Sequence, residues 1–117
     1  MASNRRDTVT IAAGESQSGE VASGPHKLVA LVIPAAWTAA AITFLTKSPI
    51  DDSWVPVYDD EGAEVSVASA NVVAGRCIAL DAIAGKLAPL LDLKLRSGTA
   101  AAPVNQAAAR EIGVLQS

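Results

Sequence analysis

The chain has 117 residues and a formal net charge of −3, which suits one domain with a core of its own. The acidic balance argues against nucleic acid as a partner, because nucleic-acid-binding domains usually present a concentrated basic face. One histidine and one cysteine supply no catalytic cluster and no internal disulfide, so we expect no enzyme, no cofactor and no metal.

The N-terminal segment, residues 1–7, is polar and shows no periodicity. We interpret it as a flexible arm and place the β-sandwich domain at residues 8–117. The domain begins with an alternation over Thr8–Ala12, in which Val9 and Ile11 share one face. This pattern is typical of a half-buried strand.

The strongest strand signal lies at Lys27–Ile33. Both of its faces are apolar, with Leu28, Ala30 and Val32 on one and Val29, Leu31 and Ile33 on the other. An antiparallel sheet normally exposes one of its faces to solvent. This strand is therefore either buried between two layers or part of a subunit interface.

The run Leu28–Thr46 has no charged residue and is long enough for a membrane-spanning helix, which is one alternative for it. Pro34 near its middle and its many β-branched residues favour two strands joined by a corner. The second of these strands spans residues 40–47, with Ile42 and Phe44 on one face. We expect no contact with a membrane.

The clearest hairpin joins residues 54–58 to residues 63–67 through the turn Asp59-Asp60-Glu61-Gly62. Pro56 removes a backbone donor and predicts that the first of these strands lies at a sheet edge.

Beyond the hairpin, residues 76–80 form a predicted strand in which Cys77 is a small buried side chain. Residues 90–96 alternate, with leucines inward and Arg96 outward. An alanine-rich helix over residues 68–87 remains an alternative for this region.

Short strands with frequent turns are typical of a sandwich or jelly roll. We predict an all-β fold, a single jelly-roll-like antiparallel β-sandwich of about eight short strands. The expected strands lie at residues 8–12, 20–22, 27–33, 40–47, 54–58, 63–67, 76–80, 90–96 and 107–115.

The first candidate site is a subunit interface on the face that carries Val29, Leu31 and Ile33, with Trp37 at the adjoining corner. A core with few aromatic residues can gain stability from oligomerisation. We therefore expect a homo-oligomer and take a trimer as the starting hypothesis. Burial between two sheets is the alternative explanation for the same residues.

The second candidate site is a glycan contact at Trp54, Tyr58 and Asp59, because aromatic faces stack on sugars and their polar tips bond hydroxyls. The alternative is that Trp54 caps a sheet edge. The acidic residues of the two neighbouring turns also raise a Ca²⁺ site, although turn formation explains them equally well.

Three blocks of the chain resemble small proteins of tailed bacteriophages and gene transfer agents. They are the stretch from His26 to Phe44, the stretch from Tyr58 to Val65, and the stretch from Leu93 to Thr99 that continues into Pro103 and Val104. This chain departs from that family at residues 46–49, where members often carry a turn resembling Ser-Asp-Gly.

The resemblance implies a β-sandwich building block of the virion without catalytic residues. On this basis we expect a capsid decoration (cement) protein on the head surface, made in the host cytoplasm. Its partners would be the major capsid protein and other virion proteins. The base of a head spike or fibre, or a carbohydrate-binding module that holds host glycans, is the alternative function.

Overall fold

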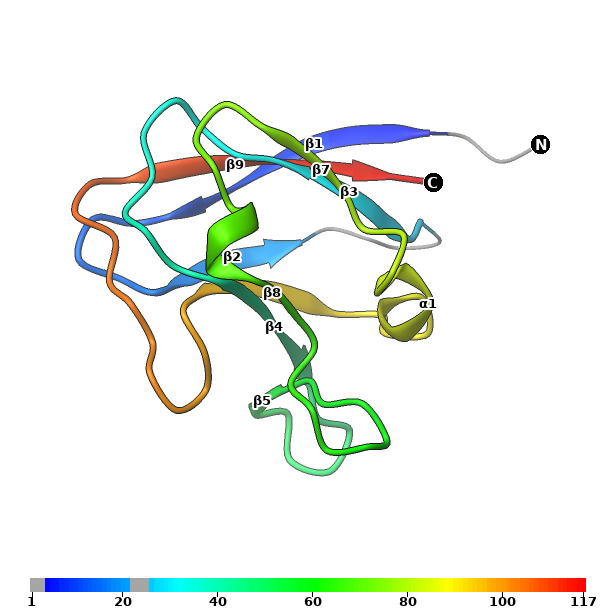
Figure 1. Ribbon diagram of the computed structural model, residues 1–117. Helices are drawn as coiled ribbons and strands as arrows, with labels where there is room; N and C mark the ends of the chain where they lie inside the picture. The colour runs from blue at the N-terminus through cyan, green and yellow to red at the C-terminus, as the bar shows by residue number, and fades with distance from the viewer. Residues whose placement is uncertain (1–3, 22–25) are drawn as a thin grey trace.

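The computed structural model describes residues 4–21 and 26–117, and β-strands dominate it (Figure 1). Its only α-helix within those residues is the single turn α1 (Ala84–Leu87), and a 3₁₀ turn, η1, spans Ser69–Asn71. The strands are β1 (Arg5–Ile11), β2 (Gln17–Val21), β3 (Leu28–Val32), β4 (Ile42–Lys47), β5 (Trp54–Pro56), β6 (Ser66–Val67), β7 (Cys77–Ala79), β8 (Leu93–Ser97) and β9 (Arg110–Gln116).

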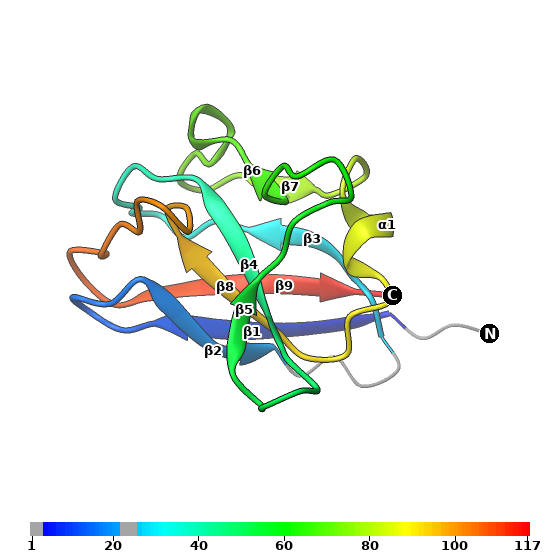
Figure 2. The same cartoon turned by 90° about the horizontal axis from the view of Figure 1, so that it is seen from below.

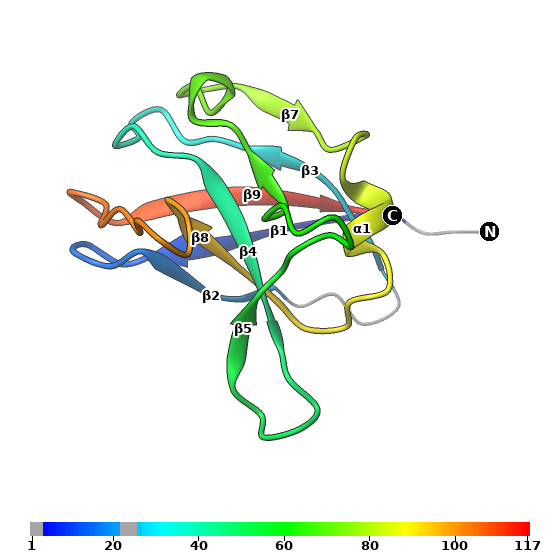
Figure 3. The same ribbon diagram turned by 60° about the horizontal axis from the view of Figure 1, so that its bottom comes forward.

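These nine strands form one antiparallel sheet in the order β5-β4-β8-β2-β1-β9-β3-β7, with β6 on the same edge of β4 as β5. The sheet curls so that its two halves face each other across the core, and the β4–β5 hairpin projects away (Figure 3). The all-β prediction is confirmed. The finer description as a jelly-roll sandwich is not confirmed, because the strands are joined in one hydrogen-bonded sheet.

The core is built from aliphatic side chains around one phenylalanine. Phe44 and Ile42 are fully buried on the same face of β4, and Val9 and Ile11 are buried on β1, as the alternation predicts. Burying such a side chain contributes about 1.5–3 kcal/mol. The opposite face of β4 is covered as well, since Thr43 and Leu45 are also buried.

The first strand begins earlier than the sequence predicts. Arg5, Arg6 and Asp7 pair with Gln116, Leu115 and Val114 of β9, so they belong to the sheet. The first three residues of the predicted arm lie outside the described residues. The apolar alternation starts only at Val9, because Arg6, Asp7 and Thr8 are exposed polar residues.

Two alternatives for helical structure are wrong. The segment from Leu28 to Thr46 consists of β3, a connecting corner and most of β4, and no helix in the described ranges is long and apolar enough to span a membrane. The segment over residues 68–87 contains η1, β7 and the short α1 in place of one alanine-rich helix.

The strand predicted at residues 90–96 begins late, since β8 starts at Leu93. Leu91, predicted inward, lies before the strand and is 74% exposed. Arg96, predicted outward, is buried. The reason is that this face of β8 is covered by other parts of the chain, which the local alternation does not reveal.

Candidate functional site

The predicted interface residues on β3 do not form a free surface. Leu31 and Ile33 are fully buried within the single chain, and Val29 is half-buried. A register shift at the start of β3 disturbs the regular alternation, which places Ala30 and Leu31 in succession under cover. Leu31 and Ile33 therefore follow the alternative explanation, burial between the two halves of the sheet.

Trp37 lies at the corner between β3 and β4 and is half-buried against the core. Its Nε1 donates a hydrogen bond to the Ala40 carbonyl at 3.3 Å. The indole therefore stabilises the corner from within.

The predicted glycan contacts lie on or next to β5. Tyr58 is 51% exposed, whereas Trp54 is half-buried. The ammonium of Lys94 lies 4.6 Å from the centre of the Trp54 ring, a cation–π geometry. One face of this indole is thus already occupied by a neighbour from β8.

Asp59 organises the turn of the predicted hairpin. Its Oδ1 accepts hydrogen bonds from the amides of Glu61 and Ala63, each at 2.9 Å, and Lys86 bonds its Oδ2 at 3.3 Å. The amide of Asp59 in turn donates to the Ala63 carbonyl at 2.8 Å. The turn is confirmed, and the bridge between Tyr58 and Glu64 closes it. The two predicted strands do not pair along their length, because β5 and β6 each pair with β4.

These contacts predict a pH dependence. The hydrogen bond from the Ala63 amide lowers the pKa of Asp59, and the Glu61 amide and Lys86 act in the same direction. Because the pKa of Asp59 is lower in the folded than in the unfolded protein, its ionised carboxylate stabilises the fold at pH values above the unfolded pKa of about 3.9. This contribution is lost as the pH falls through the folded pKa. We therefore expect the amide proton shifts of Glu61 and Ala63 to move together during acid titration followed by NMR.

The matched controls are two asparagine variants. In Asp59→Asn the joint movement of the two amides should disappear, whereas Asp60→Asn should retain it. An equal movement in Asp59→Asn would contradict the assignment to this carboxylate.

The second acidic turn is separate from the first. Asp51 accepts hydrogen bonds from the amide and the hydroxyl of Ser53 in the β4–β5 connection. No group of three or more histidine, cysteine, aspartate or glutamate side chains that could hold a metal ion occurs among the residues that the structure describes. Asp51 and Asp59 each hold their own turn through side-chain hydrogen bonds.

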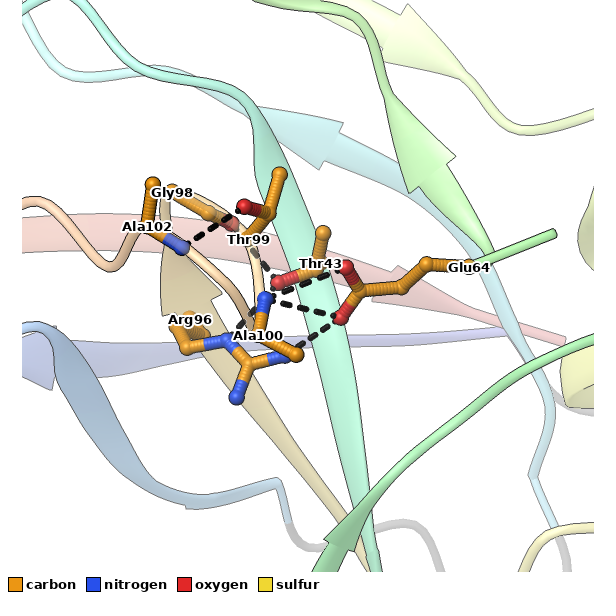
Figure 4. A network of polar contacts seen from close by, with 7 residues as sticks. All are labelled: Thr43, Glu64, Arg96, Gly98, Thr99, Ala100 and Ala102. Carbon is orange, nitrogen blue, oxygen red and sulfur yellow. Dashed lines mark hydrogen bonds and ion pairs between the residues drawn. The ribbon is translucent and has the colours of Figure 1, made fainter.

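A buried ion pair that the sequence analysis missed connects β8 to Glu64, which lies just before β6 (Figure 4). Arg96 pairs with Glu64, and its Nε donates to the Thr43 hydroxyl at 3.0 Å. Glu64 also accepts from the Ala100 amide at 3.1 and 3.2 Å. The Thr43 hydroxyl donates to the Gly98 carbonyl at 2.8 Å, so the network fixes the loop that follows β8 to the outer face of β4.

A second buried polar residue, Gln106, joins three connections. Its side chain accepts from the amide of Thr38 and donates to its carbonyl, and it donates to the Ser97 hydroxyl at 2.6 Å. Its backbone bonds to Gly14 and Glu15 in the β1–β2 turn. Arg110, four residues later, also donates to Gln106 Oε1 at 3.0 Å. No local signal marks this glutamine as buried, because its contacts with Thr38, Gly14 and Glu15 are brought together by the fold.

An open groove lies between β6 and β7. It encloses about 520 Å³ and is lined by Ser66, Val67, Ala68, Asn71, Ala82, Ile83 and the run from Arg76 to Leu80. Cys77, predicted as a buried residue, is exposed here. The prediction is wrong because Cys77, like Ala79, lies on the outer face of β7, whereas Ile78 between them packs against the core.

Arg96 and Glu64 neutralise each other in a buried pair, and the groove carries one charged side chain, Arg76, among uncharged residues. A nucleophile–base pair within hydrogen-bonding distance is absent from the contacts of the described part of the chain.

The comparisons with known proteins concern the fold. No match was found to a protein-family model or to a curated protein. Among solved structures, the crystal structure of the SPBc2 prophage-derived protein YomS matches with a TM-score of 0.53 and 14% sequence identity. The alignment covers 100% of this chain and 97% of that chain, so the likeness is one of fold over the whole length of both.

Proposed function

We propose that this chain is a non-enzymatic structural protein of a bacteriophage that attaches to the capsid surface as a decoration (cement) protein. The observation that carries the proposal is the fold that it shares over its full length with a prophage-derived protein. The resemblance of three sequence blocks to small virion proteins supports the same role.

The surface supports attachment to other proteins. Ile50 at the tip of the β4–β5 hairpin is 92% exposed and Leu91 is 74% exposed. A hollow of about 370 Å³ lies beside them, lined by Pro49, Leu91 and their neighbours. Covering this apolar surface would stabilise an assembly, and a capsid lattice multiplies weak contacts. We place the contact with the major capsid protein at this end of the molecule.

The test is co-expression with the major capsid protein encoded in the same genome, followed by gradient sedimentation of the assembled shells. We expect the chain to co-sediment with the shells and to raise their resistance to heat. Ile50→Asp combined with Leu91→Asp should abolish co-sedimentation, because both changes place a charge in the apolar contact.

Val73→Asp is the matched control, since Val73 is an exposed apolar residue away from the hairpin. Leu31→Asp is unsuitable, because it would unfold the monomer from within its core. A wild-type chain that stays at the top of the gradient contradicts capsid attachment. Binding confined to one vertex would assign the chain to the base of a spike or fibre.

Solution mass addresses the proposed homo-oligomer directly. Light scattering on the purified chain should give a closed oligomer, with a trimer as our hypothesis. A monomer that nevertheless binds shells would leave assembly to the capsid lattice alone.

Host-glycan binding is a second candidate, favoured by the 51% exposure of Tyr58 at the sheet edge that also carries Trp54. Such binding can coexist with a place on the capsid surface. In a Trp37→Phe variant Trp54 is the one remaining tryptophan. A shift of its fluorescence during titration with simple sugars would support glycan binding, and an unchanged spectrum would contradict it.

A further inference from the structure

The curled sheet stops short of closing on itself. In the sheet order β7 is the last strand at one end, and β6 lies on the opposite edge with β4 as its partner. Figure 2 shows β6 and β7 beside each other on the same side of the molecule. Residues of both strands line the 520 Å³ groove, so the groove lies between two strand edges.

The backbone of β7 is turned outward at alternate residues. The Arg76 carbonyl accepts from the Ile33 amide at 2.8 Å, and the Leu80 amide donates to the Val29 carbonyl at 2.9 Å. In an antiparallel ladder, residues alternate between facing the partner strand and facing away from it. Cys77 and Ala79 therefore direct their amides and carbonyls toward the groove.

Such a row of alternating donors and acceptors is complementary to the backbone of another extended chain. The groove has room for this, because the side chains of Cys77, Ala79, Ala68 and Ala82 are small. A strand added to β7 would lie about 4.8 Å from it, with β6 on the other side of the groove.

The positive charge of Arg76 favours one orientation of the bound segment. Arg76 is the one charged side chain among the residues that line the groove, and it lies at the beginning of β7. Its guanidinium is exposed and donates to the Asn71 carbonyl at 3.3 Å. An acidic residue in the bound segment would therefore be favoured at this end.

We propose that the groove between β6 and β7 binds an extended segment of another polypeptide, which adds to β7 as a strand and places an acidic residue beside Arg76. The proposal does not depend on the capsid function, since the edge presents the same groups to any partner.

The experiment selects a random dodecapeptide library, displayed on yeast, against the purified chain. We expect the enriched peptides to carry alternating β-branched residues and an aspartate or glutamate near one end. The synthesised consensus peptide should slow amide exchange at Cys77 and Ala79.

Ala79→Pro removes one outward donor without breaking a bond to β3, so it should weaken consensus-peptide binding at least tenfold. Ala79→Thr keeps the amide and should retain binding. Arg76→Glu should also weaken binding, and replacing the peptide's acidic residue with lysine should restore it. This charge exchange tests the proposal even where the proline variant does not fold.

Three results would overturn the proposal. One is that no peptide distinguishes the wild-type chain from both variants. Another is enriched peptides whose binding survives the charge reversal at Arg76. The third is slow exchange at Cys77 and Ala79 in the peptide-free protein with the mass of a dimer, which would assign the groove to a second copy.

Discussion

Replacing Arg96 with methionine should lower the free energy of unfolding by about 3 kcal/mol, the lower part of the range for breaking a buried ion pair. The change leaves the carboxylate of Glu64, whose side chain is only 13% exposed, without its cation. It also removes the donor to the Thr43 hydroxyl. The Ala100 amide still binds Glu64 and limits the loss. Urea denaturation with an unchanged m-value measures the effect.

The control is Lys94→Met, two residues earlier on the same strand. Lys94 contacts the Trp54 ring near the surface, a contact worth about 0.5–1 kcal/mol. Combining Glu64→Gln with Arg96→Met removes both charges and should recover part of the loss. Equal losses for Arg96→Met and Lys94→Met would show that the buried pair contributes no more than a surface contact.

Replacing Gly98 with alanine should destabilise the protein by about 2–5 kcal/mol, from the strain of a positive φ together with overpacking. Gly98 has a φ of +91°, and a Cβ built on it would lie 2.5 Å from both the Ala102 carbonyl oxygen and the Val104 amide nitrogen. Both are backbone atoms, so the loop itself must move. That movement would also disturb the Gly98 carbonyl, which accepts from Thr43. Thermal unfolding measures the loss.

Gly85→Ala is the matched control for this change. Gly85 lies in α1, and a Cβ there would have no heavy atom within 4 Å. Alanine favours a helical position over glycine by about 0.5–1 kcal/mol, so this variant should be as stable as the wild type or slightly more so. A Gly98→Ala variant with wild-type stability would mean that the loop accommodates a side chain without strain.

Arg96→Met and Gly98→Ala both affect the loop after β8, because Arg96 pairs with Glu64 and Glu64 accepts from the Ala100 amide of that loop. Variants that share a network are not additive. The loss in the double variant should therefore be smaller than the sum of the two single losses.

Turn residues and short alternating patterns were enough to predict the all-β fold class. The alternation at Val9 and Ile11 and the turn at Asp59 depend on neighbours within a few residues, and both predictions are confirmed. Cys77 was misassigned because the outer face of β7 is left uncovered by the rest of the chain. The segments that cover or expose this face lie far away in the sequence, so no local pattern predicts it.

The sequence by itself determined the all-β class, the inward faces of β1 and β4, and the aspartate turn after Tyr58, because these follow from side-chain period and local hydrogen bonds. Only the tertiary structure decided that β3 is buried within the chain, that Arg96 lies under cover with Glu64, and that a groove remains open between β6 and β7. The physical reason is that each depends on contacts between segments far apart in the chain, which no local pattern encodes.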